Sequence, residues 1–510
     1  MKISKFLFFF FLISGLTLNF SSYGQIKRDY TELDKYISKA VNDFDVPGVA
    51  IGIIKNGEVT FAKGYGYRNT ETKEPVNTKT IFGIASCTKA FTAASVGILV
   101  DKDKLNWDDE VITYYPDFQL YDPYITRDFR VDDLLCHRSG YETFDGDLLW
   151  YGTNYTREEV LKRFRHRKNS YGFRRKFGYS NLMFIAAGEM IESVTGESWD
   201  DFVKENIFVP LGMNSTTTTN SGFNSGMDIA TPHLEGKPVD FINYDNIGAA
   251  GSINSNVDDM LKWIELWLNK GVYDGDTLFS QSVYNTATLP HTNLSWKDEE
   301  IKGGTHFYSY GLGWFMNDYD GIKIIHHGGG LPGFHSKVVL IPSENTGFVI
   351  LSNQLSGLVD ALYRKLLDFN LDIQNPKDWA AIYLRRKQSR DAREEAGKHT
   401  NTVKIDTEST GPSLTLDNYT GIYEDDMYGK AGISFKNGKL HLSLLPAKEL
   451  LSGDLEHFRY DTFKFRFNDR FLKPGKLTFY INEAGEPEYF TISLDSDDFL
   501  FNKLKFKKVN

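Results

Sequence analysis

The chain has 510 residues, of which 41% are hydrophobic and 25% are charged, and its formal net charge is −10. The length exceeds one ordinary domain, and the composition is that of a globular protein, so we expect two domains after a leader. The negative charge argues against nucleic acid or an anionic membrane surface as a partner.

The first 24 residues have the pattern of a secretory signal peptide. Lys2 and Lys5 precede an apolar run over residues 6–18, and small residues at Ser22 and Gly24 offer a cleavage site. The run is too short for a stable spanning helix, and no second long apolar segment follows it. The sequence therefore predicts a periplasmic or secreted protein without stable membrane insertion.

Helical and strand patterns alternate over the next 350 residues. Residues 29–44 have helical periodicity, and Asn56-Gly57 between two apolar runs predicts a β-hairpin. An Ala-rich helix follows from Lys89, and the segment 108–269 is mostly helical. Predicted strands then cover residues 311–316, 323–327, 334–342 and 346–352, before a helix over 359–370. We predict an α+β fold, in which helices flank an antiparallel sheet and an all-helical subdomain lies between its strands.

The C-terminal part differs in character. Residues 376–412 combine a charged helix, over 378–398, with a segment rich in Thr and Ser, which we interpret as a linker with one solvated helix. From residue 413 onward, short alternating segments predict an antiparallel β-barrel or sandwich. The predicted organisation is a signal peptide (1–24), a first domain (25–375), a linker (376–412) and a second domain (413–510).

Ser86 is the serine of this chain that has a lysine three residues later, in Ser86-Cys-Thr-Lys89. Residues three apart on a helix share a face, so Lys89 can reach the Ser86 hydroxyl and help to remove its proton. The N-terminus of a helix also favours developing negative charge. This pair predicts a serine nucleophile with its own base.

A second group is expected to relay protons and to orient a substrate. Tyr179-Ser180-Asn181 precedes a predicted helix, and its phenol and amide suit these two roles. A tyrosine held near cations can lose or share its proton well below its normal pKa, and we expect this of Tyr179. The same Tyr-x-Asn spacing recurs in three other places, at residues 67–69, 244–246 and 480–482, which we interpret as packing in loops or strands.

A third element ends a predicted strand with His326-His327-Gly328-Gly329-Gly330. Glycine allows the backbone to approach a substrate closely, and its N–H groups can complete an oxyanion hole with the N–H of Ser86. Successive strand residues point to opposite faces, so only one of the two histidines can face the site. The spacing to Gly333-Phe334 favours His327.

The chain has two cysteines, Cys87 and Cys136, and a disulfide between them stays open at this point. Cys87, beside the candidate nucleophile, is either a catalytic thiol or a small buried apolar residue, and we favour the second interpretation. Neither cysteine has the spacing of a zinc site, and we predict no metal and no cofactor.

Taken together, these segments resemble the serine β-lactamase and penicillin-binding-protein superfamily, and most closely its class C-like branch of esterases and D-amino-acid peptidases. Ser86 and Lys89 match its S-x-x-K motif, Tyr179 and Asn181 its Tyr-x-Asn form, and His327-Gly328-Gly329 its His-x-Gly form. The similarity spans about residues 30–370. Further similar segments lie outside the site, at residues 134–140, 210–213, 248–251 and 258–260. Residues 414–510 resemble the lipocalin-like domain that is often appended to this branch.

The resemblance implies a serine hydrolase that forms an acyl-enzyme on an ester or an amide. Ser86, Lys89 and Tyr179 would be catalytic, while Asn181, His327, Gly329 and Gly330 would bind the substrate or the oxyanion. A histidine in the third motif is more typical of esterases and D-peptidases than of true β-lactamases. Two alternatives remain, a β-lactamase proper and a penicillin- or peptidoglycan-binding protein without turnover. The expected partner is a small molecule or a peptide, and the sequence does not fix the oligomeric state.

Overall fold

A nine-stranded antiparallel sheet organises the first domain, in the strand order β10-β11-β12-β13-β14-β15-β1-β2-β3. The computed structural model describes residues 28–224, 226–295, 305–400 and 410–509, so the predicted signal peptide lies outside the described residues. The strands of the sheet are β1 (Gly48–Lys55), β2 (Glu58–Asn69), β3 (Glu74–Pro75), β10 (Thr292–Asn293), β11 (Tyr308–Tyr310), β12 (Phe315–Tyr319), β13 (Ile322–Leu331), β14 (Phe334–Ile341) and β15 (Thr346–Ser352).

The turn between β1 and β2 follows the sequence prediction. Asn56 and Gly57 both have positive φ, of 52° and 77°, as a type I′ hairpin turn requires. On its other side, β1 pairs with β15, which ends at Ser352. Strands from both ends of the first domain therefore lie side by side.

Two of the predicted strands needed correction. The prediction of a strand over residues 311–316 was wrong at its centre, because Gly313, with φ of 75°, lies in the turn between β11 and β12. In contrast, β13 continues four residues beyond the predicted end at His327, through the three glycines. Antiparallel pairing with β14 satisfies the backbone there, so the glycines stay extended without side chains to pack.

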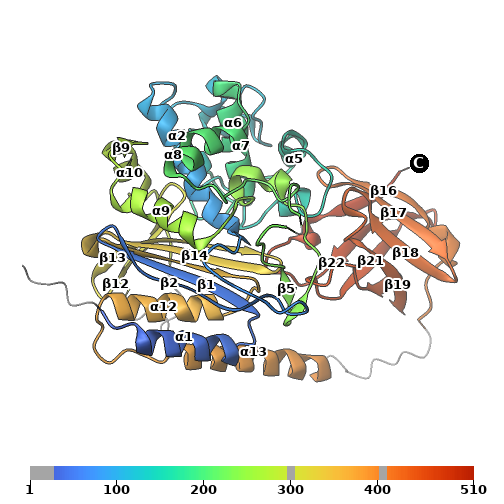
Figure 1. Ribbon diagram of the computed structural model, residues 1–510. Helices are drawn as coiled ribbons and strands as arrows, with labels where there is room; N and C mark the ends of the chain where they lie inside the picture. Colours follow the sequence, from blue (N-terminus) through green and yellow to red (C-terminus); the bar gives the residue numbers. More distant parts are fainter. Residues whose placement is uncertain (1–27, 225, 296–304, 401–409, 510) are drawn as a thin grey trace, which may run out of the picture.

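One face of the sheet is covered by α1 (Thr31–Asp43), α12 (Leu358–Asn370) and the first turns of α13 (Trp379–Thr400), which lie below the sheet in Figure 1. The expectation that α13 is merely a solvated helix was wrong for these turns. Trp379 is buried against α12, and its indole N–H donates to Asp368 Oδ2 at 2.6 Å. An apolar N-terminal turn therefore fixes a helix whose later residues are charged.

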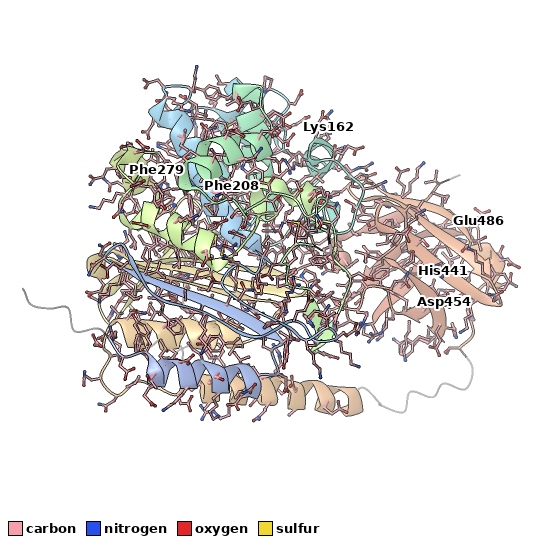
Figure 2. All side chains as sticks on the ribbon, viewed as in Figure 1. Lys162, Phe208, Phe279, His441, Asp454 and Glu486 are labelled. Atoms are coloured by element: carbon pink, nitrogen blue, oxygen red, sulfur yellow. The ribbon has the colours of Figure 1, made fainter. Side chains whose placement is uncertain are left out.

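Helices cover the opposite face and form the predicted helical layer (Figure 1). Phe208 and Phe279, labelled in Figure 2, belong to its core, where Phe91 stacks on Trp263 with ring centroids 3.8 Å apart. The helices are α2 (Thr88–Asp101), α3 (Val111–Tyr114), α4 (Pro123–Asp128), α5 (Arg157–Phe164), α6 (Asn181–Thr195), α7 (Trp199–Val203), α8 (Val209–Leu211), α9 (Val257–Leu268) and α10 (Gln281–Ala287).

Short helical turns and two-residue strands connect these helices. The turns are η1 (Ala85–Cys87), η2 (Asp132–Leu135), η3 (Asp147–Leu149), the π-helical η4 (Lys204–Phe208) and η5 (Asp245–Ala250), with η6 (Pro342–Glu344) in the sheet region. The strand pairs are β4 (Phe82–Gly83) with β7 (Asn254–Ser255), β5 (His233–Leu234) with β6 (Lys237–Pro238), and β8 (Val272–Tyr273) with β9 (Asp276–Thr277).

The second domain is a closed barrel, which decides between the predicted barrel and sandwich. Its strands are β16 (Gly421–Asp425), β17 (Gly429–Lys436), β18 (Lys439–Leu444), β19 (Ser452–Arg459), β20 (Thr462–Phe465), β21 (Gly475–Ile481), β22 (Pro487–Ser493) and β23 (Lys505–Lys508). The turns η7 (Leu416–Tyr419), η8 (Leu445–Ala447) and η9 (Phe501–Lys503) connect them. Sequence reasoning missed β19, because it is largely polar.

Aromatic rings fill the inside of this barrel. Tyr419, Tyr423, Phe479 and Phe490 pack in contact with one another, with ring centroids 4.7 to 6.0 Å apart. Polar side chains lie on the outside, as Figure 2 shows for His441 and Asp454. The high aromatic content of the chain is in this domain a packing feature.

The barrel docks on the helical layer near α5 (Figure 1). The hydroxyl of Tyr151 donates to Asp469 of the barrel at 2.7 Å, and that of Tyr155 donates to the carbonyl oxygen of Tyr428 at 2.8 Å. The ring of Phe499 lies 4.2 Å from that of Tyr151. One short segment of the first domain, residues 150–155, therefore holds much of this interface.

Cys87 and Cys136 are both free and buried, so no disulfide joins them. None of the helices within the described ranges is both long enough and apolar enough to cross a membrane.

Candidate active site

Ser86 lies in the short turn η1, directly before α2. Ala85 and Cys87 on either side are buried, whereas Ser86 is partly exposed. Ala85 has φ of 49°, in the left-handed region that costs an L-residue about 1–2 kcal/mol. Backbone strain of this kind is typical of functional sites, and here it is found one residue before the candidate nucleophile.

Lys89 is completely buried on the first turn of α2, and its amine nitrogen lies 3.1 Å from Ser86 Oγ. It donates to Asn181 Oδ1 at 2.6 Å and to the carbonyl oxygen of Ala250 at 2.8 Å. Burial lowers the pKa of Lys89 to about 7, and the negative charge of Asp147 opposes this shift. A neutral Lys89 is expected of a buried, cation-rich site, and of these two causes it is burial that lowers its pKa here.

The contacts of Lys89 fit the ammonium, which would donate to all three oxygens, and also the neutral amine that a pKa of about 7 allows. The two carbonyl oxygens can only accept hydrogen bonds, so each must receive an N–H of Lys89. A neutral amine has two N–H groups and one lone pair. With both N–H groups engaged, the lone pair is left for the third neighbour, the hydroxyl of Ser86.

Tyr179 ends the loop before α6, and its ring lies 4.7 Å below the Lys89 amine. The expectation of a lowered phenol pKa was wrong in direction. Burial raises the pKa of Tyr179 above its ordinary value of 10, and its interaction with the Ser86 hydroxyl offsets only part of this. The phenol therefore keeps its proton and is placed to donate it.

Asn181, the first residue of α6, makes contacts that sequence reasoning did not anticipate. Its oxygen accepts from Lys89, while its Nδ2 donates to Asp147 Oδ2 at 2.6 Å. Both ends of its amide are bound to these two side chains, and since Asn181 also lines the pocket, its role in positioning a substrate stays a prediction. Its visible effect is to orient Lys89.

Asp147 was missed by sequence reasoning. It is 2% exposed in η3, and burial raises its pKa to about 8, against the lowering effect of the hydrogen bond from Asn181. No recognisable motif surrounds it. The one local signal is Gly146, whose φ of 89° marks a turn that directs the next residue inward.

His327 faces Tyr179, with ring centroids 6.3 Å apart, while His326 faces Tyr363 of α12. The Nδ1–H of His327 donates to the carbonyl oxygen of Gly328 at 2.6 Å, so Nε2 accepts from the hydroxyl of Tyr310 at 2.9 Å. Burial holds the pKa of His327 well below its ordinary value. The ring is therefore neutral and fixed in one tautomer.

The glycines of β13 allow the strand to pass close to the Ser86 turn. A Cβ on Gly329 would lie 2.3 Å from the carbonyl oxygen of Ile84 and 2.9 Å from Ala85 Cβ, so no side chain fits there. Gly330 is exposed and lines the same pocket as Ser86, and a Cβ there would lie 3.3 Å from the side chain of Leu355. The strand edge next to Ser86 is thus bare backbone, as the sequence predicted.

His137 is a second residue that sequence reasoning did not assign to the site. Its Nδ1 accepts from the backbone N–H of Ser180 at 3.1 Å, and its ring lies 4.1 Å from that of Tyr179. Burial holds its pKa well below the ordinary value, so the ring is neutral. The histidine was visible only as part of the segment 134–140 that resembles the superfamily.

Of the Tyr-x-Asn triplets, only that at Tyr179 adjoins Ser86 in the described structure. The others lie in β2, in η5 and on the outside of the barrel, where Tyr480 is 42% exposed. Three distant segments, around Ser86, Tyr179 and His327, are thus brought together.

These residues line a pocket of about 560 Å³ that both domains build. The first domain contributes Ser86, Tyr179 and His327, together with Trp150 and Tyr151. The barrel contributes Phe471, Leu472, Ser496, Asp498 and Phe499. In the part of the chain that the structure describes, no three side chains of His, Cys, Asp or Glu gather as they would to hold a metal ion.

The fold and the arrangement of Ser86, Lys89 and Tyr179 are those expected of a serine hydrolase of the β-lactamase type, and comparison with known sequences identifies the family. Residues 33–372 match the family described as Beta-lactamase, so the chain belongs to this family of hydrolases. Residues 406–508, which include the barrel, match a domain of unknown function, DUF3471. The resemblance to the β-lactamase and penicillin-binding-protein superfamily is thereby confirmed.

Particular relatives share most of the chain. The unguisins hydrolase ungD′ of Aspergillus campestris is 28% identical over 428 residues, which cover 79% of this chain and 77% of that protein. Protein flp of Staphylococcus aureus is 28% identical over 362 residues, covering 69% and 68%.

Two solved structures have the same fold. The octameric penicillin-binding protein homologue of Pyrococcus abyssi, 23% identical, has a TM-score of 0.60 and covers 94% of this chain and all of its own. The D-amino acid amidase of Ochrobactrum anthropi SV3, 21% identical, has a TM-score of 0.54 and covers 67% of this chain and 99% of its own.

Proposed function

We propose that the protein is a serine hydrolase that cleaves an ester or an amide through an acyl-enzyme on Ser86. The observation that carries this proposal is the environment of Lys89. A buried amine with a pKa of about 7 has its two N–H groups bound to acceptors and its third neighbour is the Ser86 hydroxyl. Such an amine is a general base for this hydroxyl.

In the proposed reaction, Ser86 Oγ attacks the carbonyl carbon while Lys89 accepts the hydroxyl proton. Tyr179 donates its phenolic proton to the leaving group as the bond to the carbonyl carbon breaks, and it takes a proton back from the Lys89 ammonium. Both groups then return to their starting states. In the second half of the reaction, water takes the place of the leaving group and attacks the acyl-enzyme. The same proton transfers run in reverse, and the acyl group is released from Ser86.

The negative oxygen of the tetrahedral intermediate needs N–H donors in fixed positions. We assign this role to the backbone N–H groups of Ser86 and Gly330, which line the same pocket. The close passage of Gly329 along Ile84 and Ala85 supports this assignment, because it fixes the distance between the two segments. His327 forms the neutral wall beside them.

For the substrate we propose an ester or a D-amino-acid amide, and the neighbouring D-amino acid amidase fold supports this choice. The barrel narrows the pocket, so we expect it to limit substrate size. A periplasmic or secreted location also stays a proposal, resting on the pattern of residues 1–24, as do the domain boundaries and a lipocalin-like origin of the barrel.

The test is Ser86→Ala. It should abolish both the turnover of p-nitrophenyl acetate and covalent labelling by a fluorophosphonate probe. Cys87→Ala is the matched control, because this neighbouring thiol is buried and its pKa is raised to about 11 by burial. Full activity of Ser86→Ala would exclude the mechanism. A burst of product without steady turnover in the wild type would favour a penicillin- or peptidoglycan-binding protein instead.

A further inference from the structure

Lys89 is held in place from two sides. On one side Asn181 accepts from its amine, and Asp147 fixes Asn181 in turn. On the other side the acceptor is the backbone carbonyl oxygen of Ala250, at 2.8 Å. Ala250 is the last residue of η5, so the position of the amine also depends on what fixes the shape of this turn.

The turn η5 has an unusual bend at Gly248. This residue has φ of 44° and ψ of −121°, a conformation that residues with a side chain rarely adopt. Beyond the bend, two consecutive carbonyl oxygens accept from side chains of α2. That of Ala249 accepts from the hydroxyl of Thr92 at 2.7 Å, and that of Ala250 accepts from Lys89. Glycine does not favour this conformation over others, so contacts from outside the turn must select it.

Arg157, the first residue of α5, supplies such a contact. Its guanidinium lies against Gly248, where a Cβ would be 2.4 Å from Nε and 2.6 Å from Cζ. The same guanidinium donates to the carbonyl oxygen of Asp245 at the start of η5, from Nε at 3.1 Å and from Nη2 at 2.8 Å. Arg157 therefore holds the first residue of the turn and fills the space at its bend.

The guanidinium is itself firmly held. The Arg157 side chain is 17% exposed and donates to both carboxylate oxygens of Asp200 in α7, at 2.5 Å and 3.2 Å. The planar fork of an arginine can bind a carboxylate and a carbonyl oxygen at once, which the single nitrogen of a lysine does not reproduce. Thr156 caps α5 and so fixes the backbone beside Arg157. This one side chain thus joins α5 and α7 to η5.

We propose that Arg157 is a positioning residue for the general base. Through η5 it holds the carbonyl oxygen of Ala250 where this oxygen accepts from Lys89, and so keeps the amine at 3.1 Å from Ser86 Oγ. Arg157 does not line the pocket in the described structure, so it acts on the reaction only through the turn. This inference rests on the proposed function, to which it adds a second anchor of the base, opposite Asn181.

Arg157→Lys tests the proposal with the positive charge retained. A lysine does not hold Asp200 and the turn together in the same way, so we expect kcat on p-nitrophenyl acetate to fall about tenfold, with KM within about twofold of the wild type. The midpoint of the rise of kcat/KM with pH should move to lower pH, because an aligned carbonyl oxygen favours the ammonium form of Lys89. A merely structural role would lower the free energy of unfolding without moving this midpoint.

Chemical rescue separates the position of the base from folding. Arg157→Ala leaves a space of the shape of a guanidinium ion, so millimolar guanidinium chloride should restore both kcat and the pH midpoint, whereas sodium chloride should not.

Arg68→Ala is the matched control. The Arg68 side chain is 18% exposed and also binds a carboxylate, that of Glu74, and a backbone carbonyl oxygen, that of Met227. It does not line the pocket. Its replacement should leave kcat and the pH midpoint unchanged, whatever it costs in stability.

A folded Arg157→Lys with the kcat and the pH midpoint of the wild type would overturn the proposal. Equal losses in Arg157→Ala and Arg68→Ala would do the same, as would a loss that guanidinium does not reverse. If neither Arg157 variant folds, Asp200→Asn decides, because it keeps the arginine and removes the charge that orients it; an unmoved midpoint there contradicts the proposal. Such a failure leaves the Ser86-dependent turnover of the wild type intact, whereas failure of the proposed function removes it.

Discussion

The two sides of the pocket are built in different ways. On the side of the first domain, Lys89, Asn181 and Asp147 form a buried chain of short hydrogen bonds that ends at Ser86. On the side of the barrel, the wall consists of rings such as Phe499 and of an exposed carboxylate, Asp498. From this difference we expect the chemistry to depend on the fixed polar side and substrate selectivity to depend on the barrel side. Substitutions on the two sides should therefore differ in kind.

The largest effect on the polar side, after loss of Ser86 itself, is expected for Lys89→Arg. A guanidinium keeps the positive charge and the N–H donors, but it has no lone pair to accept the serine proton at neutral pH. We expect kcat/KM to fall by about 10³, within the range that general-base catalysis contributes. Lys89→Met, which keeps the length of the side chain without any charge, should fall similarly, and thermal unfolding of both variants checks that they fold.

In the wild type the same lysine predicts the pH profile. Because the base must be unprotonated and the pKa of Lys89 is about 7, kcat/KM should rise as the pH increases through 7. Tyr179 should not limit activity in this range, since its pKa is raised. A profile that falls between pH 6 and 8 would contradict the assignment, as would a Lys89→Arg variant within tenfold of the wild type.

A smaller and more specific effect is expected for Asp147→Asn. The amide keeps an acceptor for Asn181 but cannot ionise. Asp147, with a pKa of about 8, is ionised only in part near pH 7, and its ionised form raises the pKa of Lys89. Its replacement should therefore shift the rising limb of the pH profile slightly to lower pH, with a loss of kcat below about tenfold. Asp147→Leu, which removes the acceptor, should lose more activity. If the rising limb of the pH profile has the same midpoint in Asp147→Asn as in the wild type, Asp147 and Lys89 titrate independently.

The same carboxyl predicts a pH dependence of stability. Its folded-state pKa of about 8 is raised above the unfolded value of about 4. The contribution of Asp147 to stability is therefore fully present below pH 4 and is lost as the pH rises through 8. As the pH rises from 4 to 8, the wild type should therefore lose stability relative to Asp147→Asn. The difference between their free energies of unfolding, measured with urea at each pH, should shift in favour of the variant.

On the apolar side, Phe499→Ala should alter selectivity without altering the chemistry. Its ring packs on Tyr151 and faces the pocket, so its removal widens the barrel wall. We expect kcat/KM for phenylacetyl and longer acyl esters to change severalfold relative to p-nitrophenyl acetate, with the pH profile unchanged. Val509→Ala, on a half-exposed residue of the barrel away from the pocket, is the control. An unchanged ratio of bulky to small substrates would remove the role of the barrel in selectivity.

The polar side could largely be predicted from the sequence, because its residues are local to motifs. Ser86 and Lys89 share one helical turn, and the glycines after His327 mark a strand that must pass close to another segment. Asp147 could not be predicted in this way. It reaches the pocket only through tertiary packing, from a turn without a motif.

The fold shows the same division between local and tertiary signals. The Asn56-Gly57 turn and the strand ending at Ser352 were predicted from local patterns. The burial of Trp379 was not, since the charged residues that follow it in α13 dominate the pattern of the helix. The contribution of the barrel to the pocket likewise depends on how the two domains dock. No local sequence pattern in either domain predicts this contact.

The smallest effect on activity is expected at the contact that holds the two sides together. Tyr151→Phe removes the hydroxyl that donates to the buried Asp469 Oδ2, which then has no protein donor for this oxygen in the described structure. The expected cost is about 1–3 kcal/mol of unfolding free energy, that of leaving a buried acceptor unsatisfied. Tyr155→Phe, which loses a bond to a carbonyl from a half-buried position, should cost less. Urea unfolding measures both, and kcat on p-nitrophenyl acetate should stay within twofold of the wild type. A large loss of kcat in Tyr151→Phe at full stability would mean that docking of the barrel also sets the geometry around Asp147, and that the two sides of the pocket are not independent.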